Sequence, residues 1–223
     1  MTGLTAVIRK ELKNLTGSGP GMFIMFALIS LLWSFMLAVS GDAGGIWFVF
    51  FAVIVTANFS GTVFIAERVN GTLEVVITSG LSRDAVLFGK TAFIIAMTSI
   101  IGLFCGALAA VWAAVLPEIV DTETLPALNR TFAVNAAALY LSATLLNAAM
   151  SAYLSVRMGN PRFLHFVNLF LTGALVAAYA AAAALFTVHP YALALTFLLT
   201  GVIFTLLARR EFAGERIIRP VIF

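Results

Sequence analysis

Charged residues are scarce in this sequence of 223 residues. Asp, Glu, Lys and Arg together make up 10% of the chain, whereas about a quarter is typical of a soluble domain. Apolar residues make up 62% of the chain, and the mean hydropathy is +1.07. Too few polar side chains are present to cover a water-facing globule of this size. The composition excludes a disordered chain and an ordinary soluble enzyme, and it predicts a protein whose main solvent is a lipid bilayer.

Two further absences limit the chemistry of the chain. The single cysteine, Cys105, excludes an intrachain disulfide and therefore a disulfide-stapled scaffold. Gly89-Lys90-Thr91 resembles the end of a phosphate-binding loop, GxxxxGK[ST], but Asp84 stands where the first glycine is required, and no strand is expected before it. The sequence therefore predicts no ATP site and no cofactor in this chain. The net charge of +3 is ascribed to membrane topology, and we expect no nucleic-acid partner.

Long uncharged stretches dominate the remainder of the chain. No Asp, Glu, Lys or Arg occurs in residues 14–41, 43–66, 91–117, 131–156 or 163–208. A helix of about 20 apolar residues crosses a hydrocarbon core of about 30 Å, so each of the first four stretches fits one crossing. The last stretch is long enough for two, and His189-Pro190 marks the break between them. Six spans are predicted, at about 21–40, 46–66, 90–116, 132–156, 163–187 and 191–208.

The distribution of basic residues predicts the orientation of these spans. With the N-terminus inside, twelve of the 13 Lys and Arg residues fall on the cytoplasmic side and only Arg130 falls outside, as the positive-inside rule expects. Both termini are therefore predicted to be cytoplasmic, and residues 209–223 form a basic cytoplasmic tail. The predicted fold is an all-α membrane protein with a single domain, residues 1–223, crossing the plasma membrane six times.

Residues 2–16 have the pattern of an amphipathic helix. Leu4, Ile8, Leu12 and Leu15 recur at helical spacing, and the opposite face carries cations such as Arg9 and Lys10. Such a helix lies flat in the membrane interface, with its apolar stripe in the acyl boundary and its cations near the headgroups. The pattern predicts an interfacial helix in front of the first span.

The longest predicted cytoplasmic segment, residues 67–89, lies between the second and third spans. It is too short to cross a bilayer, and Ser82 has the side chain of a residue that caps the helix of the third span. Glu67 and Glu74 fall near a common polar face, and four apolar residues fall on another: Val69, Leu73, Val76 and Ile77. A short helix with such a face buries it on the membrane or in the groove of a partner.

This segment also carries a resemblance to a known family. Glu67-Arg68, Gly71-Thr72-Leu73-Glu74, Ser79-Gly80-Leu81-Ser82 and Gly89-Lys90 together resemble the signature of type-2 ABC-transporter permeases. The start of the chain, Ile8-Arg9-Lys10-Glu11-Leu12, is similar to the connecting helix of that family. Two departures are present: Ser79-Gly80 replaces the usual Thr-Pro, and the loop between the fifth and sixth spans is short.

The resemblance implies a function and a set of partners. The chain would be the membrane-spanning half of an ABC transporter, an exporter, paired with a second copy of itself or a similar permease. A separate cytoplasmic ATPase would hold ATP and Mg²⁺, so this chain would have no catalytic residues. Residues implied to couple to the ATPase are Glu67, Val69, Gly71, Thr72, Leu73, Glu74, Val76, Ile77 and Ser82. The connecting helix would use Ile8, Arg9, Lys10 and Leu12.

Two other classes of function remain open at this stage. A carrier or membrane assembly factor outside the ABC class, including one related to haem export, is the main alternative, although the span interiors lack the acidic residues of ion-coupled carriers. An intramembrane enzyme is disfavoured because His165 and His189 fall at opposite membrane surfaces, about 30 Å apart, and neither is expected to bind a metal. The pair Gly102-x-x-x-Gly106 fits either helix packing within one chain or a dimer seam. The substrate is not specified by the sequence.

Overall fold

The computed structural model describes residues 3–17, 19–40, 44–70, 80–116, 130–157, 161–186, 189 and 191–213. These residues form helices joined by short turns, and none of them belongs to a strand. Six helices are long and apolar enough to cross a membrane. The predictions of an all-helical fold and of six helices able to span a membrane are therefore confirmed for this part of the chain.

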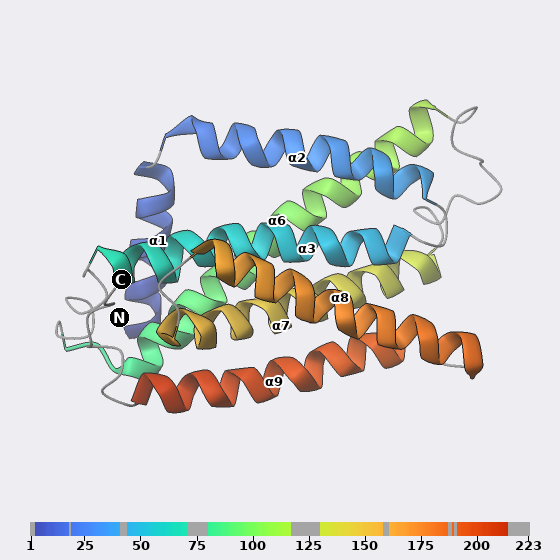
Figure 1. Cartoon of the computed structure of the whole chain (residues 1–223). Coiled ribbons are helices and arrows are strands. Elements are labelled where there is room, and N and C mark those ends of the chain that lie inside the picture. Colours follow the sequence, from blue (N-terminus) through green and yellow to red (C-terminus); the bar gives the residue numbers. More distant parts are fainter. Residues whose placement is uncertain are drawn as a thin grey trace.

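The helices follow the predicted order along the chain (Figure 1). Helix α1 spans Gly3–Gly17 and α2 spans Pro20–Val39. Helix α3, Gly44–Ser60, continues through the π-helical turn η2, Gly61–Ile65, into α4, Ala66–Val69. The remaining spans are α6 (Arg83–Val115), α7 (Arg130–Arg157), α8 (Pro161–Leu185) and α9 (Tyr191–Ala213).

The helix of the third span begins at Arg83, ahead of the apolar crossing predicted from about residue 90. Ser82 is the N-cap residue, and the backbone N–H of Ala85 donates to its Oγ atom at 3.2 Å. This bond satisfies one of the backbone donors that the first turn of a helix leaves without a partner. The helix therefore starts at the cap that the sequence suggests and runs without a break through Gly89 and Lys90.

The two ends of the bundle differ in chemistry. Helix α1 lies across one end, where α4 ends, α6 begins and α9 ends (Figure 1). We call this the charged end, because Arg209 pairs with Asp84 at 2.9 Å and Arg157 pairs with Glu211 at 2.6 Å there. The opposite end holds tryptophans. We call it the tryptophan end and define it by Trp33, Trp47 and Trp112.

The tryptophan end is tied together by indole hydrogen bonds. Trp33 Nε1 donates to the carbonyl oxygen of Trp47 at 2.8 Å, and Trp112 Nε1 donates to Ser34 Oγ at 3.1 Å. Trp side chains gather at the boundary between hydrocarbon and water, where the ring is in an apolar layer and its N–H finds a polar partner. We therefore expect one membrane interface at the level of these three rings.

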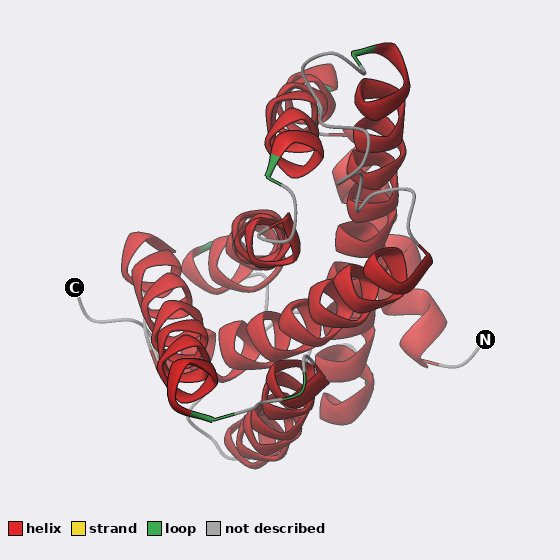
Figure 2. Ribbon diagram, turned by 90° about the vertical axis from the view of Figure 1, so that its right-hand side faces the viewer, coloured by secondary structure: helices red, strands yellow, loops and turns green. Residues whose placement is uncertain are grey.

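The helices are buried to very different degrees. Helix α7 packs most extensively against α9 and α3, whereas α2 packs mainly on α6, as the end-on view in Figure 2 shows. In the apolar window of α3 and η2, 72% of the residues are buried, against 17% in α8. Large apolar side chains such as Leu32 and Phe170 are about 70% exposed. Such an outer surface fits a hydrocarbon solvent and not water.

Some polar side chains inside the spans bond across helices. Asn147 and Thr172 join α7 to α8, with Asn147 Nδ2 donating to Thr172 Oγ1 at 3.3 Å, and Asn168 Nδ2 donates to Ser151 Oγ at 2.7 Å. Such bonds contribute roughly 0.6 kcal/mol each on average in membrane proteins. Structural roles thus account for Asn147 and Asn168.

Candidate functional site

A cluster of buried charges lies at the charged end of the bundle. The ammonium Nζ of Lys90 in α6 lies 2.8 Å from Oε1 of Glu11 in α1 and 2.6 Å from Oε2 of Glu67 in α4. Its third contact is the carbonyl oxygen of Val63 at 2.7 Å. Lys90 is fully buried, and Glu11 and Glu67 are 4% and 8% exposed. We call Glu11, Glu67 and Lys90 the buried charged cluster.

A close helix contact brings α1 into this cluster. Val7, Glu11 and Leu15 recur every four residues and form the buried face of α1. A Cβ atom added to Gly89 would lie only 2.8 Å from the Cβ of Val7, so the absence of a side chain at Gly89 lets α1 lie directly on α6. The Gly89-Lys90 pair therefore has a structural use: the glycine admits the helix and the lysine binds its carboxylate.

The electrostatics of the cluster are balanced. All three ammonium donors of Lys90 have an oxygen within hydrogen-bonding distance. Burial on its own raises the pKa of Glu67, but the ammonium groups of Lys90 and Lys10 outweigh it and hold that pKa below its ordinary value. Lys10 also bonds directly to Glu67 Oε1 and lies 3.5 Å from Glu11 Oε1. Two lysines thus neutralise two carboxylates at the membrane boundary.

The contact with Val63 places Lys90 on an unusual stretch of backbone. Val63 lies in η2, the π-helical turn at the end of the second span. π-helical turns are rare in proteins overall, but those that occur are often found at functional sites. Lys90 therefore binds both a side chain and the backbone at the end of the second span. The cluster joins α1, the end of the second span and the start of the third, and residues 71–79 connect the last two.

Residues 3–17 form the helix α1, but its faces differ from the prediction. Leu15 is buried in the bundle and Ile8 is partly buried, whereas Leu4 and Leu12 are 37% and 48% exposed. The predicted single stripe toward the membrane is therefore wrong in this respect, because half of it packs on the protein. Leu4 and Leu12 stay available to the acyl boundary. Arg9 is exposed, and Lys10 bonds to Glu67.

Glu67 and Lys90 have partners that the sequence does not specify. The coupling of Glu67 to an ATPase stays a prediction, and in the structure its carboxylate pairs with Lys90 and Lys10 of the same chain. Lys90 is expected as a cytoplasmic topological charge at a span boundary, yet it is wholly buried within α6. The sequence does hold a signal for this ion pair. Glu67 directly follows the uncharged stretch 43–66 and Lys90 directly precedes the stretch 91–117, so two antiparallel spans bring both residues to the same end of the bundle.

The remaining predicted coupling residues are only partly covered by the structure. Ser82 caps α6 and Val69 is the last residue of α4. Six further predicted coupling residues lie outside the described residues: Gly71, Thr72, Leu73, Glu74, Val76 and Ile77. Their expected contact with an ATPase stays a prediction. The helices before and after these residues, α4 and α6, contribute Glu67 and Lys90 to the buried charged cluster.

The two histidines lie toward opposite ends of the bundle. His165 is in the first turns of α8, and its Nε2 atom would lie 3.8 Å from a Cβ built at Gly61 of the π-helical turn. His189 precedes α9 near the other end and is exposed. Within the described ranges no group of three or more His, Cys, Asp or Glu residues could hold a metal ion.

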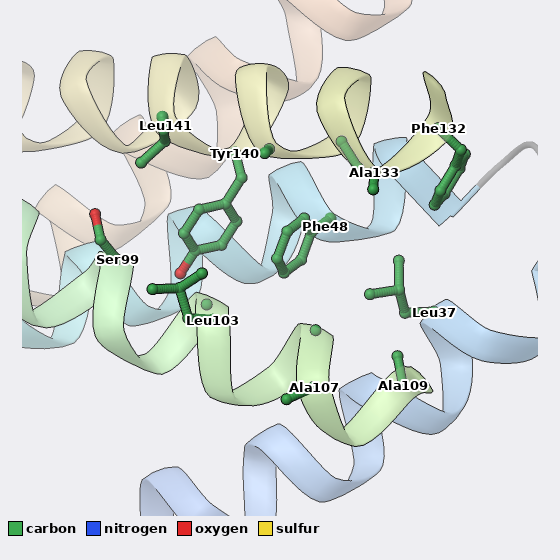
Figure 3. Close-up of a pocket in the computed structure, with 14 residues that line it drawn as sticks. Leu37, Phe48, Ser99, Leu103, Ala107, Ala109, Phe132, Ala133, Tyr140 and Leu141 are labelled. Carbon is green, nitrogen blue, oxygen red and sulfur yellow. The ribbon is translucent and has the colours of Figure 1, made fainter. Parts of the chain in front are cut away.

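A pocket of about 370 Å³ lies in the half of the bundle nearer the tryptophan end (Figure 3). Helices α6 and α7 form most of its lining, and Leu37 and Phe48 contribute from α2 and α3. The ring of Tyr140 stacks on Phe48 at a centroid distance of 4.2 Å, and its hydroxyl donates to the carbonyl oxygen of Thr98 at 2.7 Å. Aromatic packing thus fixes one wall of the pocket.

The two glycines of the GxxxG pair have different surroundings in this pocket. A Cβ at Gly102 would lie 2.4 Å from the ring of Tyr140, so this glycine makes room for packing within the chain. No described atom lies within 4 Å of a Cβ at Gly106, which faces open space. The structure therefore assigns Gly102 to packing within the protomer.

The chain matches no protein-family model, no curated protein and no solved structure.

Proposed function

We propose that this chain is the membrane-spanning permease subunit of an ATP-driven ABC transporter, working as an exporter. It forms the translocation pathway as a dimer with a second copy or a similar permease in the plasma membrane. A separate cytoplasmic ATPase supplies ATP hydrolysis, with ATP and Mg²⁺ bound on that partner. The six apolar spans support a membrane protein of this kind, and the sequence of residues 67–90 carries the resemblance.

One observation carries the proposal further than the resemblance alone: Lys90 binds Glu11 and Glu67 at 2.8 and 2.6 Å. A partner that pushes on residues 71–79 acts on α4 and on the start of α6, which flank this segment. Because Lys90 also binds α1, the connecting helix moves with both of them. The buried charged cluster thus offers a mechanical path from a cytoplasmic partner to the first, second and third spans.

The test is co-purification of the ATPase from native membranes. A tagged chain is extracted in mild detergent, and the proteins retained with it are identified by mass spectrometry. Leu73→Asp and Glu74→Lys should release the ATPase or uncouple ATP hydrolysis from transport, because losing a central anchor of an interface typically costs about 2 kcal/mol or more. His189→Lys, at the opposite end of the bundle, is the matched control and should retain the ATPase.

The outcome also separates this function from its main alternative. If both loop variants keep the ATPase and transport like the parent chain, residues 71–79 are not the coupling element. If the wild-type chain brings down no ATPase from native membranes, a carrier or assembly factor outside the ABC class is favoured.

A further inference from the structure

We propose that the pocket between α6 and α7 binds one acyl chain of a membrane lipid from the leaflet at the tryptophan end. This site is separate from the buried charged cluster, which lies at the other end of the bundle. The proposal does not rest on the transporter function, because any protein with this arrangement of spans would present the same hollow to the bilayer.

The size of the pocket fits a long alkyl chain. Its volume is about 370 Å³, and an engineered apolar cavity of about 150 Å³ in another protein binds a benzene molecule of six carbons. In the same proportion, this pocket has room for about fifteen carbon atoms. A whole lipid is too large for it, but one acyl chain fits.

The lining of the pocket selects an apolar ligand. Ser99 and Tyr140 are the polar side chains among the described residues that line it. Ser99 Oγ donates to the carbonyl oxygen of Ile95 at 2.7 Å, and the Tyr140 hydroxyl donates to that of Thr98 at 2.7 Å. Both hydroxyl protons are already engaged, so a polar ligand would lose its hydration without adequate replacement. An alkyl chain has no hydrogen bonds to water, so it loses none when it enters the pocket.

The depth of the pocket matches the acyl region of one leaflet. Trp112 marks the interface on α6, and Gly106 and Gly102 precede it on the same helix. At about 1.5 Å per residue, Gly106 lies roughly 9 Å and Gly102 roughly 15 Å from Trp112 along the helix axis. Both distances fall within one half of a hydrocarbon core about 30 Å thick. A lipid with its headgroup at the level of the tryptophans would have its chain beside these glycines.

The mouth of the pocket continues into the lipid-facing surface. Leu103 is 76% exposed and Leu141 is 49% exposed, and both line the pocket. Figure 3 shows them on facing helices, with Tyr140 between α6 and α7. Two projecting leucines beside a local hollow suit a thin, flexible chain. A second helix, about 10 Å across with its side chains, would need a longer and flatter contact surface than the mouth of this pocket offers.

The experiment uses the full chain reconstituted in phosphatidylcholine nanodiscs that contain a trace lipid with a diazirine in the middle of one acyl chain. After irradiation, cross-linked peptides are mapped by mass spectrometry. We expect the label on α6 and α7 at the pocket residues. Gly106→Leu should reduce this yield about tenfold by filling the hollow. Gly173→Leu is the matched control on α8, where a Cβ also meets no described atom within 4 Å, and it should label like the wild type.

Two additions keep the test decisive. If Gly106→Leu does not fold, Ala133→Leu fills the pocket from the facing helix. Equal labelling of wild type and both filled variants would overturn the proposal. So would efficient disulfide dimerisation of Gly106→Cys in the membrane, which would show that a second copy covers the pocket.

Discussion

The Nζ atom of Lys90 in α6 lies 2.6 Å from Oε2 of Glu67 in α4, although residues 70–82 separate the two helices along the chain. The ion pair ties the end of the second span to the start of the third. Glu11 adds α1 to the same point.

Removing the ammonium group should strongly destabilise the protein. Lys90→Met leaves two buried carboxylates without their main partner, and breaking a buried ion pair from one side costs about 3–5 kcal/mol. Thermal unfolding of the purified protein in detergent measures the loss. Lys13→Met, which removes an exposed lysine from α1, is the control and should have little effect. A Lys90→Met protein as stable as this control would contradict the ion-pair assignment.

The stability contribution of Glu67 should depend on pH. Because the folded protein holds the pKa of Glu67 below its ordinary value of 4.5, the contribution is fully present above that value and is lost as the pH falls through the folded pKa. Wild type should therefore be more stable than Glu67→Gln at neutral pH, and the difference should shrink in acid. The measurement is the unfolding midpoint of both proteins from neutral pH downward. A difference that grows below pH 4.5 would have the wrong sign.

Gly89 should be intolerant of a side chain. A Cβ at this position lies 2.8 Å from that of Val7, so Gly89→Ala must push α1 away from α6, at a cost of about 1–3 kcal/mol. Val7→Gly in the same protein removes the Cβ and Cγ1 atoms of this contact and should recover part of the loss, which a double-mutant cycle detects. Gly17→Ala, where no described atom lies within 4 Å, serves as the comparison. Additive effects of the Gly89 and Val7 changes would argue against the contact.

The two glycines of the GxxxG pair should respond in opposite ways. Gly102→Ala overlaps the ring of Tyr140 and should lower stability by about 1–3 kcal/mol. Gly106→Ala meets open space and should be neutral or stabilising by up to about 1 kcal/mol, since alanine favours helix over glycine. Unfolding of the two variants side by side checks this. A larger loss at Gly106 would indicate that this residue makes a close contact.

The orientation predicted by the basic residues can be tested with single cysteines. The native Cys105 is fully buried and should not react. Cysteine at His189, at the tryptophan end, should react with an impermeant thiol reagent in intact cells. Cysteine at Asn70, exposed at the charged end, should react only after the membrane is opened. The reverse labelling pattern would place the charged end outside.

The sequence was sufficient for the spans because charge-free length is a local property of the chain. Its limits appear where one helix meets another. The buried face of α1 depends on contact with Gly89, and the periodicity of α1 alone cannot distinguish a face toward lipid from a face toward protein. Lys90 seemed an ordinary boundary charge for the same reason: its burial follows from Glu11 and Glu67, which come from distant parts of the chain.

The π-helical turn has a consequence for the rotational phase of the chain. A π turn holds one residue more than an α-helical turn. The side chains of α4 therefore point in the directions they would have if the second span were a regular α-helix with one residue removed. Relaxation of Gly61–Ile65 to α-helix without loss of a residue would rotate Glu67 by about 100° around the helix axis, away from Lys90. The ion pair and the wide turn therefore depend on each other. Together they set the angle at which the chain enters residues 71–79.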